Sequence, residues 1–158
     1  TQVSLFDISD LANPTRIDQW SLPGAWAEAE VNARAFLYWA PEDLVVLPIN
    51  VQPWGQEGQR DPFFGAIALG VADGSIVERA EITHASGVPE KFCETWLEES
   101  EDGDAITHDE CWVQPDYQTV ISRSVVVGDT LFTLSEKGLL ASDLDTLRPG
   151  IFVPFGNS

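Results

Sequence analysis

The chain has 158 residues, and its 26 Asp and Glu residues against 8 Lys and Arg give a formal net charge of −18 at pH 7. A surface this acidic repels phosphate backbones and anionic lipid headgroups, so nucleic-acid binding and peripheral membrane attachment are not expected. Hydrophobic residues make up 44% of the chain, which is enough for one folded domain. No apolar run approaches the roughly 18 residues of a membrane helix, so membrane insertion by this segment is not expected either.

The sequence reads as short strands separated by turn residues. Asp73-Gly74 is a strong signal for a two-residue hairpin turn, and Pro48 inside a strand indicates an edge or a bulge. Residues 25–31 have helical composition but are too few to form a helix alone. No long stretch keeps helical spacing, so the sequence predicts an all-β protein. Alternation predicts strands at residues 3–8, 16–22, 33–39, 44–51, 63–71, 76–83, 120–127, 131–135, 139–144 and 151–155.

These strands group into a repeated four-stranded antiparallel meander. Residues 33–84 form one full copy, residues 118–156 form another, and residues 1–24 form the outer half of a preceding copy. Radially repeated meanders of this kind are the blades of a β-propeller. The sequence therefore predicts a propeller fragment of about two and a half blades. Residues 85–117 form an acidic insertion between the two full blades, expected as an excursion over the surface.

The two cysteines, Cys93 and Cys111, lie within this insertion. A disulfide between them, formed outside the cytosol, would close a polar surface segment and remove denatured-state entropy worth about 3 kcal/mol in the chain-entropy model. Two unrelated thiols are one alternative. A metal pair assisted by His84 or His108 is another, although the spacing does not match a zinc site. We expect the disulfide.

Three segments also resemble a known family. They are VSLFDISDLANPTRIDQW (residues 3–20), EAEVNARAFLYWAPEDLVVLPI (residues 28–49) and ISRSVVVGDTLFTLSEKGLLASDLDTL (residues 121–147). They are similar to the C-terminal part of secreted bacterial and archaeal β-propeller domain proteins distantly related to WD40 repeats. The most specific pieces, FDISDLANP and RSVVVGDTLFTLS, encode strands and turns and no chemistry. The resemblance implies an extracellular or cell-surface location and earlier blades in a longer chain.

Two arginines are candidate ligand residues. Arg34 and Arg123 occupy matching positions at the start of the innermost strand of the two full blades, so both would lie near one mouth of the central channel. Planar guanidinium groups suit bidentate binding of a carboxylate or another oxyanion. The alternative, which the net charge of −18 favours, is that each arginine neutralises an acidic neighbour such as Glu30 or Asp116.

The tryptophans indicate a second candidate surface. Trp20 and Trp39 fall within predicted strands, where they would fill the space between blades. Trp54, Trp96 and Trp112 fall outside the predicted strands and could form a recognition surface for a protein or a glycan. Equally, Trp96 and Trp112 could pack over the disulfide as a small core for the insertion.

The acidic run at residues 98–104, with Asp109 and Glu110 behind it, has the oxygen ligands and the glycine turn that Ca²⁺ prefers, but it lacks the spacing of an EF-hand. A solvated charged loop is the favoured interpretation. Ca²⁺ is therefore the one cofactor that the sequence admits, and no cofactor is required.

Catalytic motifs are absent. Neither His84, expected as a turn or rim residue at a strand end, nor His108 lies in a nucleophile motif, and no phosphate-binding loop appears. Carboxylate pairs for glycoside hydrolysis cannot be singled out among 26 acidic residues.

The sequence therefore favours a non-enzymatic, extracellular or cell-surface β-propeller scaffold that binds a protein or glycan partner. The alternatives are an extracellular hydrolase with an acidic site at the channel mouth, and a structural component of a surface layer or filament. The half blade at residues 1–24 lacks two inner strands, and open sheet edges aggregate unless they are paired. We expect the remaining blades to come from a longer chain, a companion chain or another copy of this one.

Overall fold

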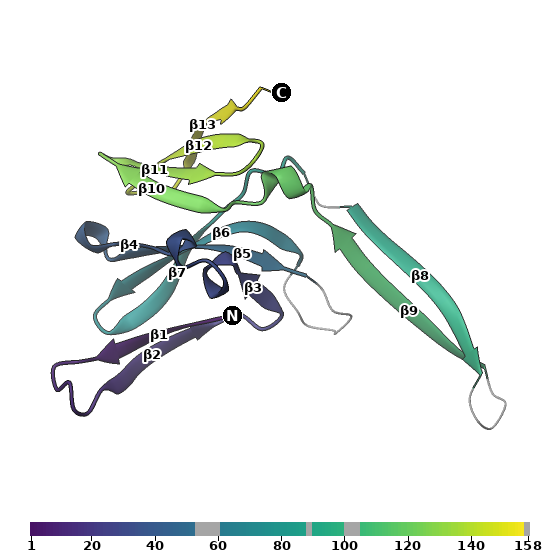
Figure 1. Cartoon of the computed structure of the whole chain (residues 1–158), viewed down its shortest axis with the longest axis horizontal. Helices are drawn as coiled ribbons and strands as arrows, with labels where there is room; N and C mark the ends of the chain where they lie inside the picture. The colour runs from purple at the N-terminus through teal and green to yellow at the C-terminus, as the bar shows by residue number, and fades with distance from the viewer. Residues whose placement is uncertain (53–60, 88–89, 100–104, 157–158) are drawn as a thin grey trace.

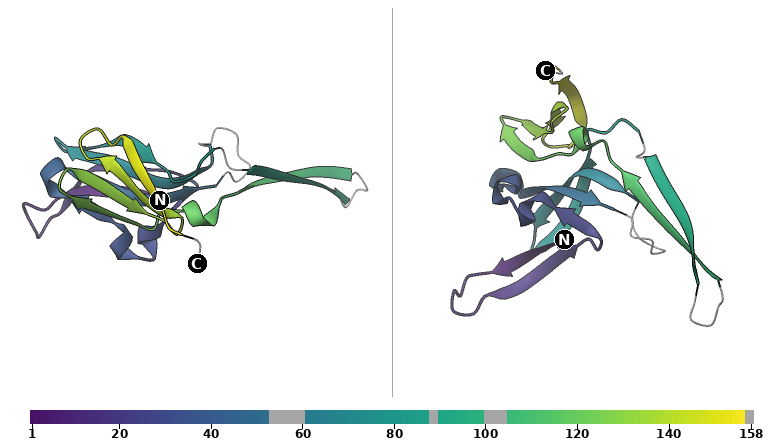
Figure 2. Two further views of the ribbon diagram at one scale, coloured as in Figure 1. Left: turned by 90° about the horizontal axis from the view of Figure 1, so that it is seen from above. Right: turned by 45° about the vertical axis from the view of Figure 1, so that its right-hand side comes forward.

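The structure is a computed structural model that describes residues 1–52, 61–87, 90–99 and 105–156. The prediction of an all-β protein is confirmed, since the helical elements of this part are four single 3₁₀ turns, η1–η4. The strands pair antiparallel in four sheets. Three sheets lie one against the next and form the body of the molecule, and the fourth projects away from it (Figures 1 and 2).

The central sheet contains the strands predicted for the blade at residues 33–84 and adds one strand from the segment before it. Its members are β3 (Ala25–Ala27), β4 (Leu37–Trp39), β5 (Leu44–Val51), β6 (Phe63–Ala72) and β7 (Ser75–Ile82). Both β3 and β4 pair with β5, along residues 49–51 and 44–46 respectively. Between them the chain leaves the sheet and forms η1 (Glu28–Glu30) and η2 (Ala33–Ala35). The continuous strand predicted at residues 33–39 is therefore wrong in its first half.

Local chemistry explains the division. The Asn32 side chain accepts a hydrogen bond from the backbone N–H of Arg34 (3.3 Å) and so caps η2. Ala33 and Ala35 lack the branched side chains that favour strands. Pro48 lies beside the gap, where neither β3 nor β4 pairs with it. No neighbouring strand on that side needs a hydrogen bond from the N–H that proline lacks. A proline is therefore tolerated in this interior strand.

The turn between β6 and β7 is the predicted two-residue hairpin. Asp73 (φ 53°) and Gly74 (φ 75°) both adopt left-handed backbone conformations. Positive φ at both central residues defines the type I′ turn, whose twist matches that of the flanking strands.

Two smaller sheets flank the central one. On one side lies the hairpin of β1 (Gln2–Asp7) and β2 (Thr15–Ser21). On the other lies the C-terminal sheet, a four-stranded meander of β10 (Arg123–Val127), β11 (Thr130–Leu134), β12 (Gly138–Asp143) and β13 (Pro149–Pro154). The other short turns are η3 (Ala40–Glu42) before β5 and η4 (Tyr117–Thr119) before β10.

Both faces of the central sheet are buried, which explains the nearly unbroken apolar sequence of β5. Trp39 packs against the interface with the C-terminal sheet, and Trp20 packs against the interface with the first hairpin. Both tryptophans therefore fill space between sheets, as predicted. The first interface is built on Leu44, Val46, Ala66, Ala68, Val126, Leu131 and Leu140, and the second on Val45, Leu47, Ile49, Ile67 and Leu69. Four-stranded antiparallel sheets stacked in this way are arranged like neighbouring propeller blades.

The outer face of the C-terminal sheet also carries many apolar residues. Val125, Val127, Ile151 and Val153 on its two edge strands are 51–73% exposed. Phe132 and Leu139 lie directly opposite Val125 and Val153 on the inner strands. An antiparallel sheet with one solvated face normally carries polar residues there. This sheet instead has the composition of one that is covered on both faces.

Candidate functional site on the hairpin arm

The fourth sheet is a long antiparallel hairpin of β8 (Glu90–Glu99) and β9 (Ala105–Gln114), which we call the arm. It projects from the body beyond the central sheet (Figure 1). The sequence predicts a surface excursion here, and the two strands are not among the predicted ones. The reason is that each face of the arm mixes apolar and charged residues, so the alternation typical of a half-buried strand is hidden.

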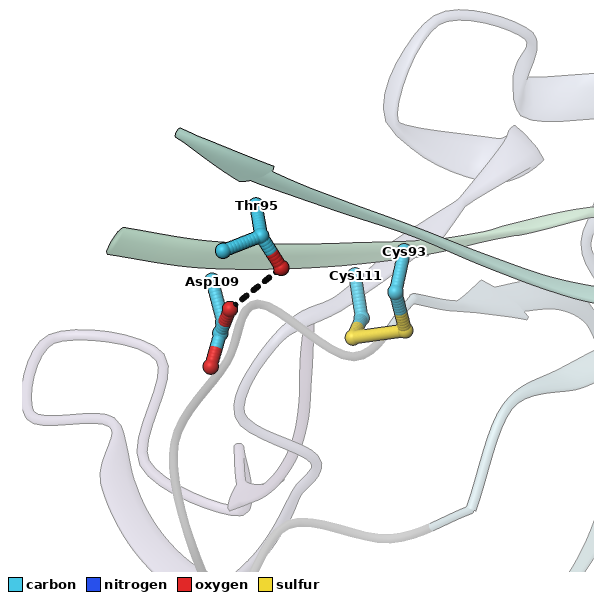
Figure 3. The surroundings of a disulfide bond; sticks show 4 residues. All are labelled: Cys93, Thr95, Asp109 and Cys111. Carbon is cyan, nitrogen blue, oxygen red and sulfur yellow. Dashed lines mark hydrogen bonds between the residues drawn. A yellow bond between two sulfur atoms is a disulfide. The ribbon is translucent and has the colours of Figure 1, made fainter. Parts of the chain in front are cut away.

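The first face of the arm carries the expected disulfide. Cys93 and Cys111 are directly opposite in the register, their Cα atoms are 4.1 Å apart, and the sulfurs are bonded. On the same face, the Thr95 hydroxyl donates a hydrogen bond of 2.6 Å to Asp109 Oδ1, as Figure 3 shows. A two-stranded hairpin alone is marginally stable in water, so this covalent link fixes the register of the arm where the body gives no support.

The second face carries four aromatic rings in two stacked pairs. Phe92 and Trp112 have ring centroids 6.1 Å apart and planes inclined by 20°, and Trp96 and His108 have centroids 5.5 Å apart and planes inclined by 16°. Nε2 of His108 also lies 2.9 Å from Oε2 of Glu98, an ion-pair contact when the imidazole is protonated. We call these four rings the aromatic face.

The aromatic face is open to solvent. Because side chains alternate along a strand, Trp96 and Trp112 lie on the side of the arm opposite the disulfide and do not pack over it. They are 45% and 38% exposed. The alternative, in which Trp96 and Trp112 form a small core over the disulfide, is therefore wrong. Two large rings that remain exposed on a stapled hairpin form a surface of the kind that binds partners.

The arm is also strongly acidic. Residues 90–114 contain nine acidic residues and a single lysine, Lys91. Glu94 lies on the same face as the aromatic rings, midway between the two pairs in the register. The surface thus combines π-systems with negative charge, a combination that attracts Arg and Lys side chains.

Two predicted features fall wholly or partly outside the described residues. Trp54 lies in residues 53–60, and most of the acidic run proposed for Ca²⁺ lies in residues 100–104. In the part of the chain that the structure describes, no group of three or more His, Cys, Asp or Glu side chains is arranged to hold a metal ion.

The two candidate arginines occupy different settings. Arg123 begins β10 as predicted, but Arg34 lies on η2 and not on a strand. Asn32 Oδ1 accepts a hydrogen bond from Nη1 of Arg123 (3.3 Å) and one from the backbone N–H of Arg34. The matching strand positions expected for an oxyanion clamp are therefore wrong.

The acidic neighbours suggested for these arginines have other partners. Glu30 Oε1 accepts hydrogen bonds from the Thr1 hydroxyl (2.5 Å) and from the backbone N–H of Ala27 (3.3 Å). Asp116 caps η4 through Oδ1 and pairs with Lys137 through Oδ2 at 3.2 Å. Asp116 shares a hollow of about 180 Å³ with Glu90 at the base of the arm. Through these two oxygens Asp116 links η4 to Lys137.

The expectation of His84 as a turn or rim residue is wrong. His84 is buried between the central and C-terminal sheets and is not on the rim. Its Nδ1 is 2.8 Å from Ser135 Oγ, and its Nε2 is 2.8 Å from Thr133 Oγ1. Phe152 meets the ring edge-on at a centroid distance of 5.2 Å. Burial lowers the pKa of the imidazole to about 4, so at neutral pH His84 is an uncharged link between two sheets. The strand-end position in the sequence carries no signal of this contact.

Comparison with known proteins identifies the fold family. A family model described as a β-propeller domain matches residues 1–147. Neither the curated proteins nor the solved structures gave a match. Among the described residues, no helix is long and apolar enough to span a bilayer. The matched residues include the first hairpin, the central sheet and the arm, and they end within the C-terminal meander. The stacked meanders are thus part of a propeller scaffold, and the chain belongs to the β-propeller domain family.

Proposed function

We propose that the chain is a non-enzymatic binding module of an extracellular β-propeller, and that the arm binds a protein partner with a basic surface. The observation that carries the proposal is the exposed aromatic face on a disulfide-stapled arm. Trp and Tyr are enriched among the residues that dominate binding energy at interfaces. Negative charge around the rings favours guanidinium and ammonium groups, which also stack on Trp faces.

The extracellular assignment rests on the disulfide. Disulfides persist in oxidising compartments and are rare in the cytosol. The Cys93–Cys111 link lies on an exposed hairpin, where reductants would reach it easily. The Cys93–Cys111 disulfide can stabilise this exposed hairpin only in an oxidising environment.

A binding role fits the acidic side chains better than hydrolysis does. Of the two carboxylates that share the hollow at the base of the arm, Asp116 is engaged by η4 and by Lys137. We propose that these groups hold the base of the arm in place. The proposed function uses no cofactor.

The remaining blades are the second partner class in this proposal. The apolar outer face of the C-terminal sheet supports a further blade on that side. A hollow of about 760 Å³ lies beside β1, lined by β1 residues and by Phe36 and Leu47 of the central blade. The lining mixes apolar residues such as Val3 and Leu22 with polar ones such as Gln2, Ser4 and Glu30. We propose that a longer chain, a companion chain or another copy supplies the remaining blades.

The arm proposal is tested with a double variant. Immobilised wild-type chain and Trp96→Ala/Trp112→Ala are incubated with secreted and surface proteins of the source cells, and retained proteins are identified by mass spectrometry. We expect a protein that wild type retains and the double variant loses, with a dissociation constant at least about tenfold higher for the variant. Raising the salt concentration should weaken the complex, because exposed charge interactions are screened.

Leu97→Ala is the matched control. Leu97 is 70% exposed on the disulfide face, so its substitution removes apolar area from the arm without changing the aromatic face. The control should retain the partner with unchanged affinity. Equal binding by wild type and the double variant would overturn the proposal.

A further inference from the structure

A separate hollow lies in the body, at one end of the interface between the central and C-terminal sheets. Its volume is about 470 Å³, which is within the range of small-molecule sites. One wall comes from the central sheet, where Trp26, Asn50 and Phe64 are direct neighbours across β3, β5 and β6. The connection from the arm to β10 supplies the other wall through Tyr117 and Ser122. Two sheets and one connection thus converge on this hollow.

Aromatic rings border the hollow from segments far apart in sequence. Trp26 is 41% exposed and Tyr117 is 67% exposed, whereas Phe64 is buried. Large rings are normally buried, and a pair that remains exposed beside one hollow indicates a stacking surface. The ring faces offer apolar contact that a flat ligand can use without displacing any part of the fold.

Polar groups complete the lining. Oδ1 of Asn50 is buried and has no hydrogen-bond partner among the described residues. An unpaired buried acceptor is costly, and a donor supplied by a ligand would satisfy it. Gln52 and Glu136 add an amide and a carboxylate. None of the described residues that line the hollow is Lys, Arg or His.

We propose that this hollow binds a neutral sugar ring. A pyranose has apolar C–H faces for Trp26 and Tyr117, and its hydroxyl groups donate to Asn50 Oδ1 and to Glu136 while accepting from Gln52. The negative charge of Glu136, with no Lys, Arg or His among the described lining residues, selects against uronic acids and against phosphorylated or sulfated sugars. This site is independent of the arm and of the partner proposed for it.

The test uses the full chain and a defined set of sugars. Glucose, galactose, mannose, N-acetylglucosamine and their linear tetrasaccharides are titrated by calorimetry, with glucuronic acid for comparison. At least one neutral sugar should bind saturably, with a dissociation constant of about 1 mM or lower, and glucuronic acid should bind at least about tenfold more weakly.

Two variants tie binding to the hollow. Tyr117→Ala alters an exposed side chain, and Asn50→Leu removes the unpaired acceptor at similar volume. Each should weaken sugar binding at least about tenfold, while the melting temperature of Asn50→Leu stays equal to that of wild type or rises. Leu97→Ala on the arm serves as the control and should bind the sugar normally. Absence of saturable binding to every neutral sugar up to about 20 mM, or unchanged affinity in both variants, would overturn the proposal.

Discussion

His84 shows how one buried side chain makes the contact between two sheets sensitive to pH. Its folded-state pKa, lowered by burial to about 4, lies below its ordinary value of 6.5. The unfolded chain therefore binds more protons between these values, and the folded state loses stability as the pH falls from 6.5 towards 4. We expect the free energy of unfolding, measured by urea titration, to fall by about 2 kcal/mol between pH 7 and pH 5 through this residue.

Substitution of His84 should isolate this contribution. His84→Gln is expected to lower stability at pH 7, because Gln cannot bridge Thr133 and Ser135 in the same way, and to reduce the pH dependence between pH 5 and 7. An identical pH slope in wild type and His84→Gln would contradict this account.

At the scale of elements, the arm depends on its disulfide. Its strands pair with each other along their whole length, and a lone hairpin is marginally stable. Opening the link in Cys93→Ser/Cys111→Ser returns loop entropy worth about 3 kcal/mol to the denatured arm. We expect amide hydrogen exchange to accelerate throughout β8 and β9, while exchange in β5 and β6 is unchanged. Slowed or unchanged exchange in β8 and β9 would contradict the role of the staple.

The elements also show what the sequence could reveal. Strands with one polar face or with two apolar faces, such as β11 and β5, were predicted from the periodicity of their sequence. The Asp73-Gly74 pair predicted the turn between β6 and β7. The arm was missed because it has no core face: Glu94 and Glu98 share the same side as Phe92 and Trp96, which blurs the period of two. The division of the innermost strand was missed because it depends on the Asn32 cap and on Arg123, which is remote in sequence. The contact of His84 with Thr133 was not predicted either, because these two residues are also remote in sequence.

At the scale of the whole molecule, the two ends of the stack differ. The outward positions of the first hairpin are mainly polar, with Gln2 and Ser4 joined by a hydrogen bond of 2.7 Å and Gln19 beside them in the register. The outward positions of the C-terminal sheet are mainly apolar, with Val125 and Val127 on β10, Phe132 on β11, Leu139 on β12 and Ile151 and Val153 on β13, and their polar members include Thr130 and Asp143. Burial of apolar area stabilises a complex by roughly 25 cal/mol per Å². Association with a further sheet or chain is therefore more favourable at the C-terminal end than at the first hairpin.

This asymmetry predicts how the isolated chain behaves in solution. Without further blades, the C-terminal face should drive self-association that rises with protein concentration, measurable by analytical ultracentrifugation, and should bind a hydrophobic dye. Val125→Lys/Val153→Lys places two charges on this face and should shift the chain to monomer with lower dye binding. Lysine is chosen because it makes the net charge of −18 less negative. Increased repulsion between the acidic chains therefore cannot explain a loss of self-association. Gln19→Lys adds the same type of charge to the polar end and should leave association unchanged. A wild-type chain that stays monomeric and binds no dye would show that the face needs no cover, and the assignment of further blades to it would fail.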